Sequence, residues 1–299
     1  AVFTNLTQDH LDYHGSMERY FEAKRTLFDM LSQDAIGVYN SDDPYGRRII
    51  LETRARTIAY GVRGADVVLK SATPTGTGMV VLLEHRGKEI KIDSPLIGDF
   101  NVENIAAAVA TAIGLGIPFD RICDGIRRLA SVRGRFQKIV SPEGWIAIVD
   151  YAHTPDALER CLHAIRSMRE RGSTDQHQRI ITVFGCGGNR DRRKRPTMGQ
   201  IATELSDVTI VTSDNPRFED PDSIIDEVME GVKPGVAAKR EPDRTRAIIM
   251  ALEMARRRDY ILIAGKGHET YQVVGDQRIP LDDREVVERF IDERRSHRG

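Results

Sequence analysis

Two short polar segments, residues 213–217 and residues 265–269, hold the side chains best suited to chemistry in this chain of 299 residues. The first reads Ser-Asp-Asn-Pro-Arg and the second Gly-Lys-Gly-His-Glu. Each follows an apolar run typical of a buried parallel strand, and open α/β sheets bind ligands at the carboxyl ends of such strands. The guanidinium of Arg217 suits a carboxylate, whereas Asp214 or Glu269 suits an ammonium group. The segments therefore predict a pocket for a small zwitterion, unless they are ordinary strand-ending turns.

A second candidate lies in residues 9–14, which read Asp-His-Leu-Asp-Tyr-His. Its histidines are four positions apart and would face the same way on a helix. A zinc protease needs glutamate directly after the first histidine, and Leu11 occupies that position, so this class is excluded. A magnesium role near a phosphate stays open, because Asp9, Asp12 and an imidazole could support a hard cation. The alternative is that these residues cap and start a helix.

Lys24 lies in a segment, residues 17–32, whose apolar residues recur at helical spacing. A lysine beside an apolar helix face usually extends its ammonium to solvent, but a desolvated lysine would lose its proton easily and react. The apolar face is expected to comprise Tyr20, Phe21, Leu27, Phe28 and Leu31.

Residues 185–195 combine a glycine-rich turn with a basic run that contains Arg190. The spacing is not G-x-G-x-x-G, so it is weak support for dinucleotide binding. A basic run is usually a solvated face, although at the end of a strand it could meet phosphate or carboxylate groups. Asp150 and His153 follow the preceding strand and could reach ribose hydroxyls or phosphate, unless Asp150 is only a cap. The sequence contains no G-x-x-x-x-G-K-[ST] phosphate loop.

The elements that must position these residues divide the chain into two parts. Residues 1–133 mix helices and strands, with a hairpin expected over residues 79–92. Residues 134–299 alternate strand and helix at regular spacing, which indicates a doubly wound, Rossmann-like parallel sheet. We therefore predict an α/β protein with domains over residues 1–133 and 134–299.

The composition excludes several classes of function. Hydrophobic residues make up 40% of the chain and charged residues 30%, as in soluble globular proteins. The formal net charge is −1, so the whole chain has no electrostatic attraction for nucleic acid or a membrane surface. Its three cysteines lack metal-binding spacing and suit a reducing cytoplasm. The first residues read like the end of a buried strand, so we expect a fragment of a longer protein.

In collinear order these segments resemble the Mur ligase family over essentially the whole chain. Members of that family have a domain for the UDP end of the substrate, a central ATPase domain and a C-terminal domain that brings the amino acid. The resemblance implies that this chain is part of the central domain plus the C-terminal domain, without the first domain and the phosphate loop. The matching segments are residues 4–15, 22–25, 98–104, 150–158, 185–199, 214–217 and 265–272.

The resemblance implies an ATP-dependent ligase of bacterial peptidoglycan synthesis, cytoplasmic and monomeric. ATP would phosphorylate the terminal carboxylate of a UDP-N-acetylmuramoyl dipeptide, and an incoming amine would attack the acyl phosphate. The Asp-Asn-Pro-Arg form is similar to members that add meso-diaminopimelate, whose distal carboxylate Arg217 would pair with. The alternatives are a lysine-adding member, a folylpolyglutamate synthetase, or a non-catalytic amino-acid-binding module. Without the phosphate loop, we expect this chain alone to show no ligase turnover.

By the same resemblance, three residues serve the phosphoryl chemistry. His10 would ligate magnesium, and Lys24 would be an N-carboxylated lysine whose carbamate is a second ligand of the metal. Carbamate formation requires an unprotonated amine, which fits a lysine at an apolar helix face. His153 would approach the reacting phosphate.

The resemblance divides the other site residues between ATP and the amino acid. The ATP contacts would be Asn101 and Asn104 on the adenine side, Asp150 at the ribose and Arg135 at the phosphates. The pocket for meso-diaminopimelate would comprise Arg190, Asp214, Asn215, Pro216, Arg217, Gly265 and Glu269.

Overall fold

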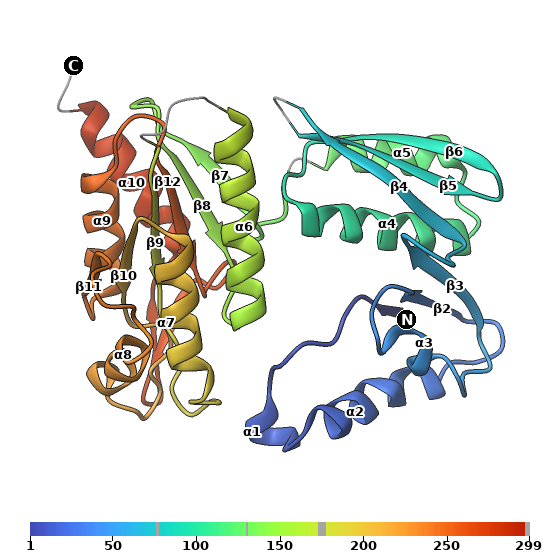
Figure 1. Cartoon of the computed structure of the whole chain (residues 1–299), viewed down its shortest axis with the longest axis horizontal. Coiled ribbons are helices and arrows are strands. Elements are labelled where there is room, and N and C mark those ends of the chain that lie inside the picture. The colour runs from blue at the N-terminus through green and yellow to red at the C-terminus, as the bar shows by residue number, and fades with distance from the viewer. Residues whose placement is uncertain (76–77, 130, 173–177, 297–299) are drawn as a thin grey trace. The chain divides into compact units, whose positions relative to one another are not determined.

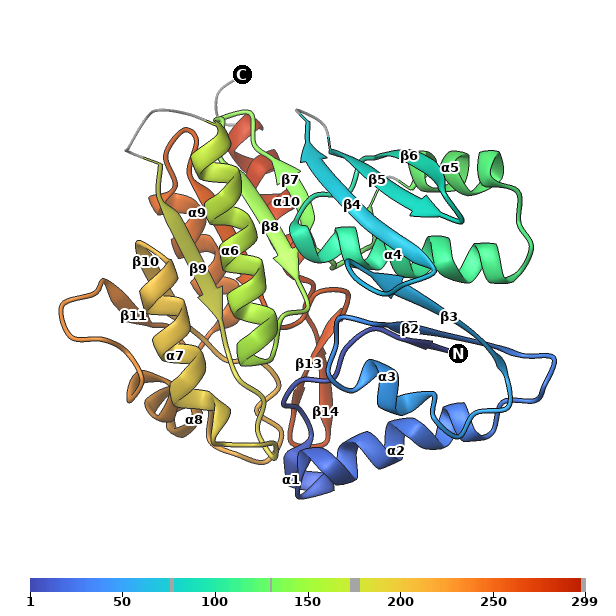
Figure 2. The same ribbon diagram turned by 45° about the vertical axis from the view of Figure 1, so that its right-hand side comes forward.

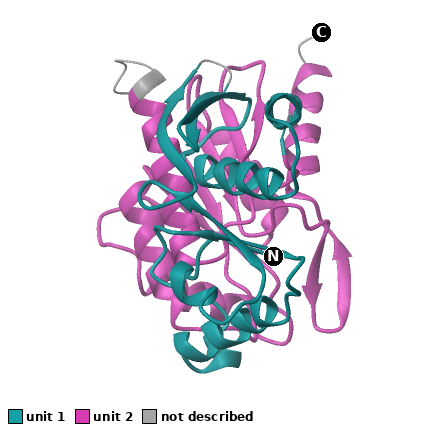
Figure 3. Cartoon of the chain, turned by 90° about the vertical axis from the view of Figure 1, so that its right-hand side faces the viewer, with its two compact units in different colours: residues 1–131 teal, residues 132–299 magenta. Residues whose placement is uncertain are grey.

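The chain folds into two compact units, residues 1–131 and residues 132–299 (Figure 3). Each unit has its own six-stranded sheet and its own apolar core. The domain boundary expected after residue 133 remains a sequence-based prediction. The computed structural model describes residues 1–75, 78–129, 131–172 and 178–296.

The sheet of the first unit has the strand order β1-β2-β3-β4-β5-β6. Strands β1 to β4 are parallel, whereas β5 and β6 add antiparallel neighbours. The predicted hairpin is confirmed, and its turn contains Arg86 and Gly87, both with positive φ. The strands are β1 (Val2–Phe3), β2 (Ile36–Asn40), β3 (Arg56–Gly61), β4 (Val67–Pro74), β5 (Met79–His85) and β6 (Lys88–Ser94).

Helix α2 is the element that carries Lys24, and it begins at Ser16, whose hydroxyl accepts a hydrogen bond from the backbone N–H of Arg19. Its buried face is centred on Phe21 and Phe28. Leu27 was expected on that face but is 56% exposed, so this prediction is wrong. Successive helical residues are about 100° apart, which turns Leu27 away from Phe28. The helices are α1 (Leu11–His14), α2 (Met17–Asp29), α3 (Gly46–Ile49), α4 (Asp99–Gly114) and α5 (Phe119–Arg128).

The sheet of the second unit has the order β11-β10-β9-β12-β8-β7, and all its strands are parallel except the edge strand β7. This confirms the predicted parallel α/β sheet. Strand β7 was not predicted, because its Gln-Lys-Ile-Val run is short and half polar. The strands are β7 (Gln137–Val140), β8 (Ile146–Asp150), β9 (Ile180–Phe184), β10 (Val208–Val211), β11 (Ala238–Arg240) and β12 (Tyr260–Ala264).

Helices cover both faces of this second sheet (Figure 1). Helices α9 and α10 pack on one face, where Ala247 and Val287 join the buried core. Helix α6 buries Leu158, Leu162 and Ile165, and Figure 1 shows α6 and α7 on the opposite face. Both faces of the central strands are therefore apolar, as expected of a parallel sheet. The helices are α6 (Pro155–Gly172), α7 (Lys194–Leu205), α8 (Pro221–Met229), α9 (Arg244–Met254) and α10 (Asp283–Ser296).

A separate two-stranded hairpin, β13 (Tyr271–Val274) and β14 (Gln277–Pro280), follows the polar loop after β12. It stands apart from the six-stranded sheet, as Figure 2 shows. The hairpin turns at Gly275, whose φ is 56°. It was not predicted, because β13 is only half-buried, β14 is exposed, and neither shows a clear apolar alternation. Among the described residues, no helix is long and apolar enough to cross a membrane.

The three free cysteines differ in burial, which predicts their reactivity. Cys161 and Cys186 are buried, and burial raises the pKa of Cys186 to about 12 and that of Cys161 well above its usual value. Cys123 is only half-buried. We expect iodoacetamide at about pH 8 to label Cys123 first, because thiolate population and access control the rate. Mass spectrometry of the labelled peptides checks this, and equally fast labelling of Cys186 would contradict its burial.

Candidate functional site

The candidate site of the second unit lies where four parallel strands end. Strands β8, β9, β10 and β12 are neighbours in the sheet, so the loops that follow them share its carboxyl edge. The backbone N–H of Gly265 donates to the carbonyl of Asp150 at 3.0 Å, which joins two of these loops. Gly265 has φ 118°, a conformation that favours glycine. The residues predicted for the amino-acid pocket are thus gathered at this edge.

Asn215 and Lys266 tie the loop after β10 to the loop after β12. The amide nitrogen of Asn215 donates to Oε2 of Glu269 at 3.0 Å. Nζ of Lys266 donates to Oδ1 of Asn215 at 3.0 Å and to Oε2 of Glu269 at 2.9 Å. Sequence reasoning did not single out Lys266, although a lysine two positions after an apolar strand was a usable signal. Glu269 and the amide of Asn215 therefore share one buried cation, and Oδ1 of Asp214 lies 3.8 Å from it.

The acidic side of this edge suits an ammonium group. Asp214 is 8% exposed, and its Oδ1 is buried without a hydrogen-bond partner in the part of the chain that the structure describes. Burial raises the pKa of Glu269, but the hydrogen bonds from Lys266 and Asn215 lower it. The lowering effects outweigh burial, so the pKa of Glu269 is below its usual value. Glu269 is therefore ionised at neutral pH, and an ammonium group would meet a carboxylate here.

The cationic side of this edge holds Arg217 and Arg190. Nη1 of Arg217 donates to the carbonyl of Gly188 at 2.8 Å, and its backbone takes the left-handed φ of 54°. Burial lowers the pKa of Arg217, and the charge of Arg190 lowers it further. No carboxylate forms an ion pair with either guanidinium among the described residues. Two neighbouring guanidiniums without an ion-paired carboxylate suit a carboxylate ligand.

The loop after β9 is held tightly against the loop after β10. A Cβ on Gly188 would lie 1.9 Å from the carbonyl oxygen of Pro216, so only glycine fits there. The carbonyl of Asn215 accepts the backbone N–H of Gly188 at 2.9 Å. These contacts bring Arg190 and Arg217 to the same place.

The basic run after β9 is not a solvated face throughout, so that interpretation is wrong for two of its residues. Arg195 is 0% exposed and pairs with Glu219 and Glu227, each at 2.9 Å. Lys194 is buried and its ammonium donates to the carbonyl of His153 at 2.8 Å. These acceptors come from α8, from its preceding loop and from the loop after β8, so the charge run alone could not reveal that the two side chains are buried.

The residues predicted to face ATP in this unit lie beside Tyr151. The guanidinium carbon of Arg135 is 4.7 Å from the ring centroid of Tyr151, and Nδ1 of His153 lies 2.9 Å from the Tyr151 carbonyl. Asp150 is 7% exposed, and its two oxygens accept the backbone N–H groups of Phe136 and Ala152. Burial raises the pKa of Asp150 against these hydrogen bonds. The carboxylate of Asp150 thus holds the backbone of two neighbouring segments, which agrees with the alternative that Asp150 acts as a cap. Its ribose contact remains a prediction.

Gly134, shortly before β7, packs against the backbone of the loop after β12. Replacing Gly134 with alanine is expected to destabilise this unit. Gly134 has φ 66°, and a Cβ there would lie 2.0 Å from the backbone nitrogen of His268. Strain of this kind costs about 1–3 kcal/mol. Urea unfolding measures the loss. The matched control is Gly235→Ala, which has a similar φ of 83° but nothing within 4 Å. Equal losses in both variants would mean that the close contact is unimportant.

In the first unit, His10 and Lys24 both lie near the ring of Tyr20. Nζ of Lys24 is 5.3 Å from the ring centroid, and the His10 ring is 6.4 Å away, edge-on. His10 has φ 53° and precedes α1, so the two histidines do not share a helix face. Lys24 is exposed, which fits a lysine extended to solvent rather than a desolvated one. Its carboxylation remains a prediction.

Asn101 and Asn104 lie on the first turns of α4. The amide nitrogen of Asn104 donates to Oδ1 of Asn101 at 3.2 Å, and that of Asn101 donates to the carbonyl of Ile97 at 2.8 Å. The structure therefore brings these two asparagines together, and their adenine contact remains a prediction. No group of three or more His, Cys, Asp or Glu side chains is placed to hold a metal within the described ranges.

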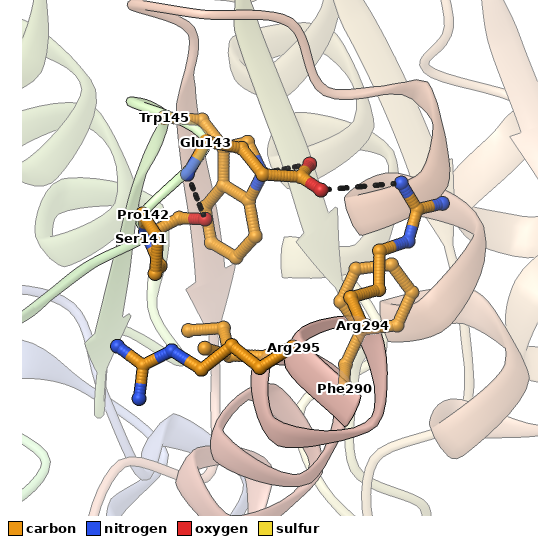
Figure 4. A pocket seen from close by; sticks show the side chains of 8 residues that line it. Ser141, Pro142, Glu143, Trp145, Phe290, Arg294 and Arg295 are labelled. Atoms are coloured by element: carbon orange, nitrogen blue, oxygen red, sulfur yellow. Dashed lines mark hydrogen bonds and ion pairs between the residues drawn. The ribbon is translucent and has the colours of Figure 1, made fainter. Parts of the chain in front are cut away.

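A cavity of about 300 Å³ lies at the other end of the second sheet, before the start of β8 (Figure 4). Its walls include Trp145 and Phe290. Glu143 accepts the indole N–H of Trp145 at 3.3 Å and pairs with Arg294 at 3.5 Å. Ligands of open parallel sheets bind at the carboxyl ends of the strands, so this cavity is not the candidate site.

Two family models match the chain in sequence order. One, described as "Mur ligase middle domain", matches residues 1–112, and the other, "Mur ligase, glutamate ligase domain", matches residues 134–267. This chain belongs to the Mur ligase family. The family and the α/β fold expected from the sequence are therefore confirmed.

Curated relatives of this Mur ligase chain are named UDP-N-acetylmuramoyl-L-alanyl-D-glutamate--2,6-diaminopimelate ligase. The one from Gloeobacter violaceus is 46% identical over 298 residues, which are 99% of this chain and 59% of the relative. The one from Solibacter usitatus is 44% identical over 295 residues, or 97% of this chain and 58% of the relative. The chain thus spans less than two thirds of the length of these relatives.

Solved structures of Mur ligases also match. A UDP-N-acetylmuramoyl-L-alanyl-D-glutamate--2,6-diaminopimelate ligase matches at 36% identity with a TM-score of 0.59, over 99% of this chain and 60% of that one. The MurF ligase of Thermotoga maritima, solved in complex with ADP, matches at 18% identity with a TM-score of 0.72, over 99% of this chain and 62% of that one. At that identity, the MurF likeness supports the fold alone.

Proposed function

We propose that this chain acts in the ATP-dependent ligation of meso-diaminopimelate to UDP-N-acetylmuramoyl-L-alanyl-D-glutamate during peptidoglycan synthesis in the bacterial cytoplasm. The observation that carries the proposal is that two guanidiniums without an ion-paired carboxylate, Arg190 and Arg217, share one sheet edge with the carboxylates of Asp214 and Glu269. The names of the relatives, at up to 46% identity, point to the same amino acid.

The chemistry of diaminopimelate matches this division of charge. Each end of the molecule carries an ammonium and a carboxylate, whereas lysine lacks the distal carboxylate. Arg217 and Arg190 would bind the distal carboxylate, and Asp214 and Glu269 would bind an ammonium group. Lysine would leave the arginines facing one another without an anion, which is a repulsive arrangement that disfavours it.

The nucleotide would be ATP, with Arg135 at its phosphates and Asn101 and Asn104 on its adenine side. Mg²⁺ commonly takes one or two protein ligands and completes its shell with phosphate and water oxygens. His10 and Lys24 fit that small share, since both lie near Tyr20 and Lys24 would offer carbamate oxygens. When bound, the ion would neutralise charge on the transferred phosphoryl group.

Calorimetric titration of this chain with meso-diaminopimelate, and in parallel with L-lysine, tests the proposal. We expect heat of binding for meso-diaminopimelate and none for lysine at the same concentration. A preference for lysine would assign the site to a lysine-adding ligase. Silence toward both amino acids would contradict the pocket at residues 214–217 in this chain.

A further inference from the structure

Lys266 is a wholly buried cation in the middle of the candidate amino-acid pocket. Its side chain is 0% exposed. Its ammonium donates to Oδ1 of Asn215 at 3.0 Å and to Oε2 of Glu269 at 2.9 Å, and it lies 3.8 Å from Oδ1 of Asp214 as an ion pair. A buried lysine is stable only when it is paired and hydrogen-bonded in this way.

Burial decides what Lys266 can do. A side chain without exposed surface has none to offer a ligand, so Lys266 acts only through the groups it touches. Three of those groups, on Asp214, Asn215 and Glu269, belong to the residues assigned to the amino-acid pocket, and the fourth is the ring of Tyr271, whose centroid lies 5.9 Å from the ammonium. The two hydrogen bonds that the described residues make to Glu269 both go to Oε2 and come from Lys266 and Asn215. They hold Oε2 of the carboxylate in place.

The other charges around Glu269 do not replace Lys266. His268 lies on the same loop and lowers the pKa of Glu269 less than Lys266 does. Arg217 and Arg244 interact with Glu269 by charge alone, with no hydrogen bond among the described residues, and Arg244 is committed to Asp283 at 2.7 Å. Asp214 adds a second negative charge beside Lys266. Lys266 is therefore the cation that directly satisfies this acidic side.

We propose that Lys266 is a positioning residue for amino-acid recognition, which holds Glu269 and Asn215 in the geometry that receives the ammonium group of the substrate. The inference rests on the proposed function, because it assumes that an ammonium group binds at Glu269. It adds a residue whose effect on binding is indirect and dependent on pH.

The sign of the pH effect follows from the contacts. In the wild type, the pKa of Glu269 is below its usual value, although burial by itself raises it. Without Lys266, the effect of burial, which raises the pKa of Glu269, is opposed less strongly. Glu269 then takes up a proton at a higher pH, and amino-acid binding is lost at a higher pH as the solution is acidified.

The experiment compares Lys266→Met with the wild-type chain by calorimetry with meso-diaminopimelate over a pH series. At neutral pH we expect roughly ten- to a hundredfold weaker binding, with part of the loss regained as pH rises. The matched control is Lys239→Met, which deletes an exposed lysine whose ammonium contacts Met254 and should leave affinity and pH profile unchanged. A folded Lys266→Met variant with wild-type affinity and pH profile would overturn the proposal.

A double-mutant comparison covers the case in which Lys266→Met does not fold. Lys266→Met/Glu269→Gln removes both charges together and should bind meso-diaminopimelate as weakly as Glu269→Gln alone, within about threefold. A much larger loss in the double variant would mean that Lys266 does not act through Glu269.

A second readout separates this inference from the proposed function. If the wild type binds no meso-diaminopimelate, the proposed function fails for this chain. The pKa of Glu269, followed by ¹³C NMR of its carboxyl group and assigned with Glu269→Gln, then judges Lys266. A higher pKa in Lys266→Met supports the positioning role, and an unchanged pKa contradicts it.

Discussion

Replacing Arg244 with leucine is expected to lower the unfolding free energy of the second unit by about 3–5 kcal/mol. Arg244 and Asp283 are both 0% exposed and form two hydrogen bonds, at 2.8 and 2.7 Å. The same guanidinium donates to the carbonyl of Ala264 at 2.9 Å, directly before the loop of Lys266. Leucine would leave the carboxylate of Asp283 buried without its cation, which is the costly step.

Urea unfolding followed by tryptophan fluorescence measures this loss, since the only tryptophan of the chain, Trp145, is buried in the second unit. The matched control is Arg246→Leu on the same helix, whose side chain is 73% exposed; its change should stay within about 0.5 kcal/mol. Arg244→Leu/Asp283→Leu should recover much of the stability, because no charge is then left buried alone. A loss under about 1 kcal/mol for Arg244→Leu would contradict the buried pair.

Arg217→Ala is expected to weaken the binding of meso-diaminopimelate by about 1.5–3 kcal/mol, the scale of a hydrogen bond to a charged group. The guanidinium has no paired acid among the described residues, so its removal leaves no orphaned carboxylate in the protein. Folding stability should fall by about 1 kcal/mol, for the lost hydrogen bond from Nη1 to the carbonyl of Gly188, which is less than the loss in binding.

The calorimetric test of this prediction needs a control that separates charge from geometry. Arg217→Lys keeps the charge but cannot form a bidentate pair with a carboxylate, so it should recover only part of the affinity. Arg217→Ala should also reduce the preference for meso-diaminopimelate over lysine. Unchanged affinity in Arg217→Ala would remove this residue from the pocket.

The framework of the second unit could be predicted from sequence because its strands are continuous apolar runs. Strands β10 and β12 are buried toward their carboxyl ends, and their apolar residues predicted where each strand ends. The loops at those ends gave the positions of Asp214 and Glu269. The parallel order then fixed which loops meet.

Other parts depend on tertiary contacts that periodicity does not encode. Lys266 and Arg195 are buried only because acceptors from distant segments surround them, and a lysine or arginine in a polar loop otherwise indicates a solvated face. His10 adopts a left-handed backbone conformation before α1, which a spacing argument based on a regular helix could not anticipate. Strand β7 and the hairpin β13–β14 lack a clear apolar alternation.

The most direct test of the account is a crystal structure of this chain with meso-diaminopimelate bound. We expect one carboxylate of the ligand within hydrogen-bond distance of Arg217, and an ammonium group facing Asp214 and Glu269. Lys266 should stay beneath Glu269 without touching the ligand. A ligand bound away from the carboxyl edge of the second sheet, or a carboxylate turned toward Glu269, would contradict it.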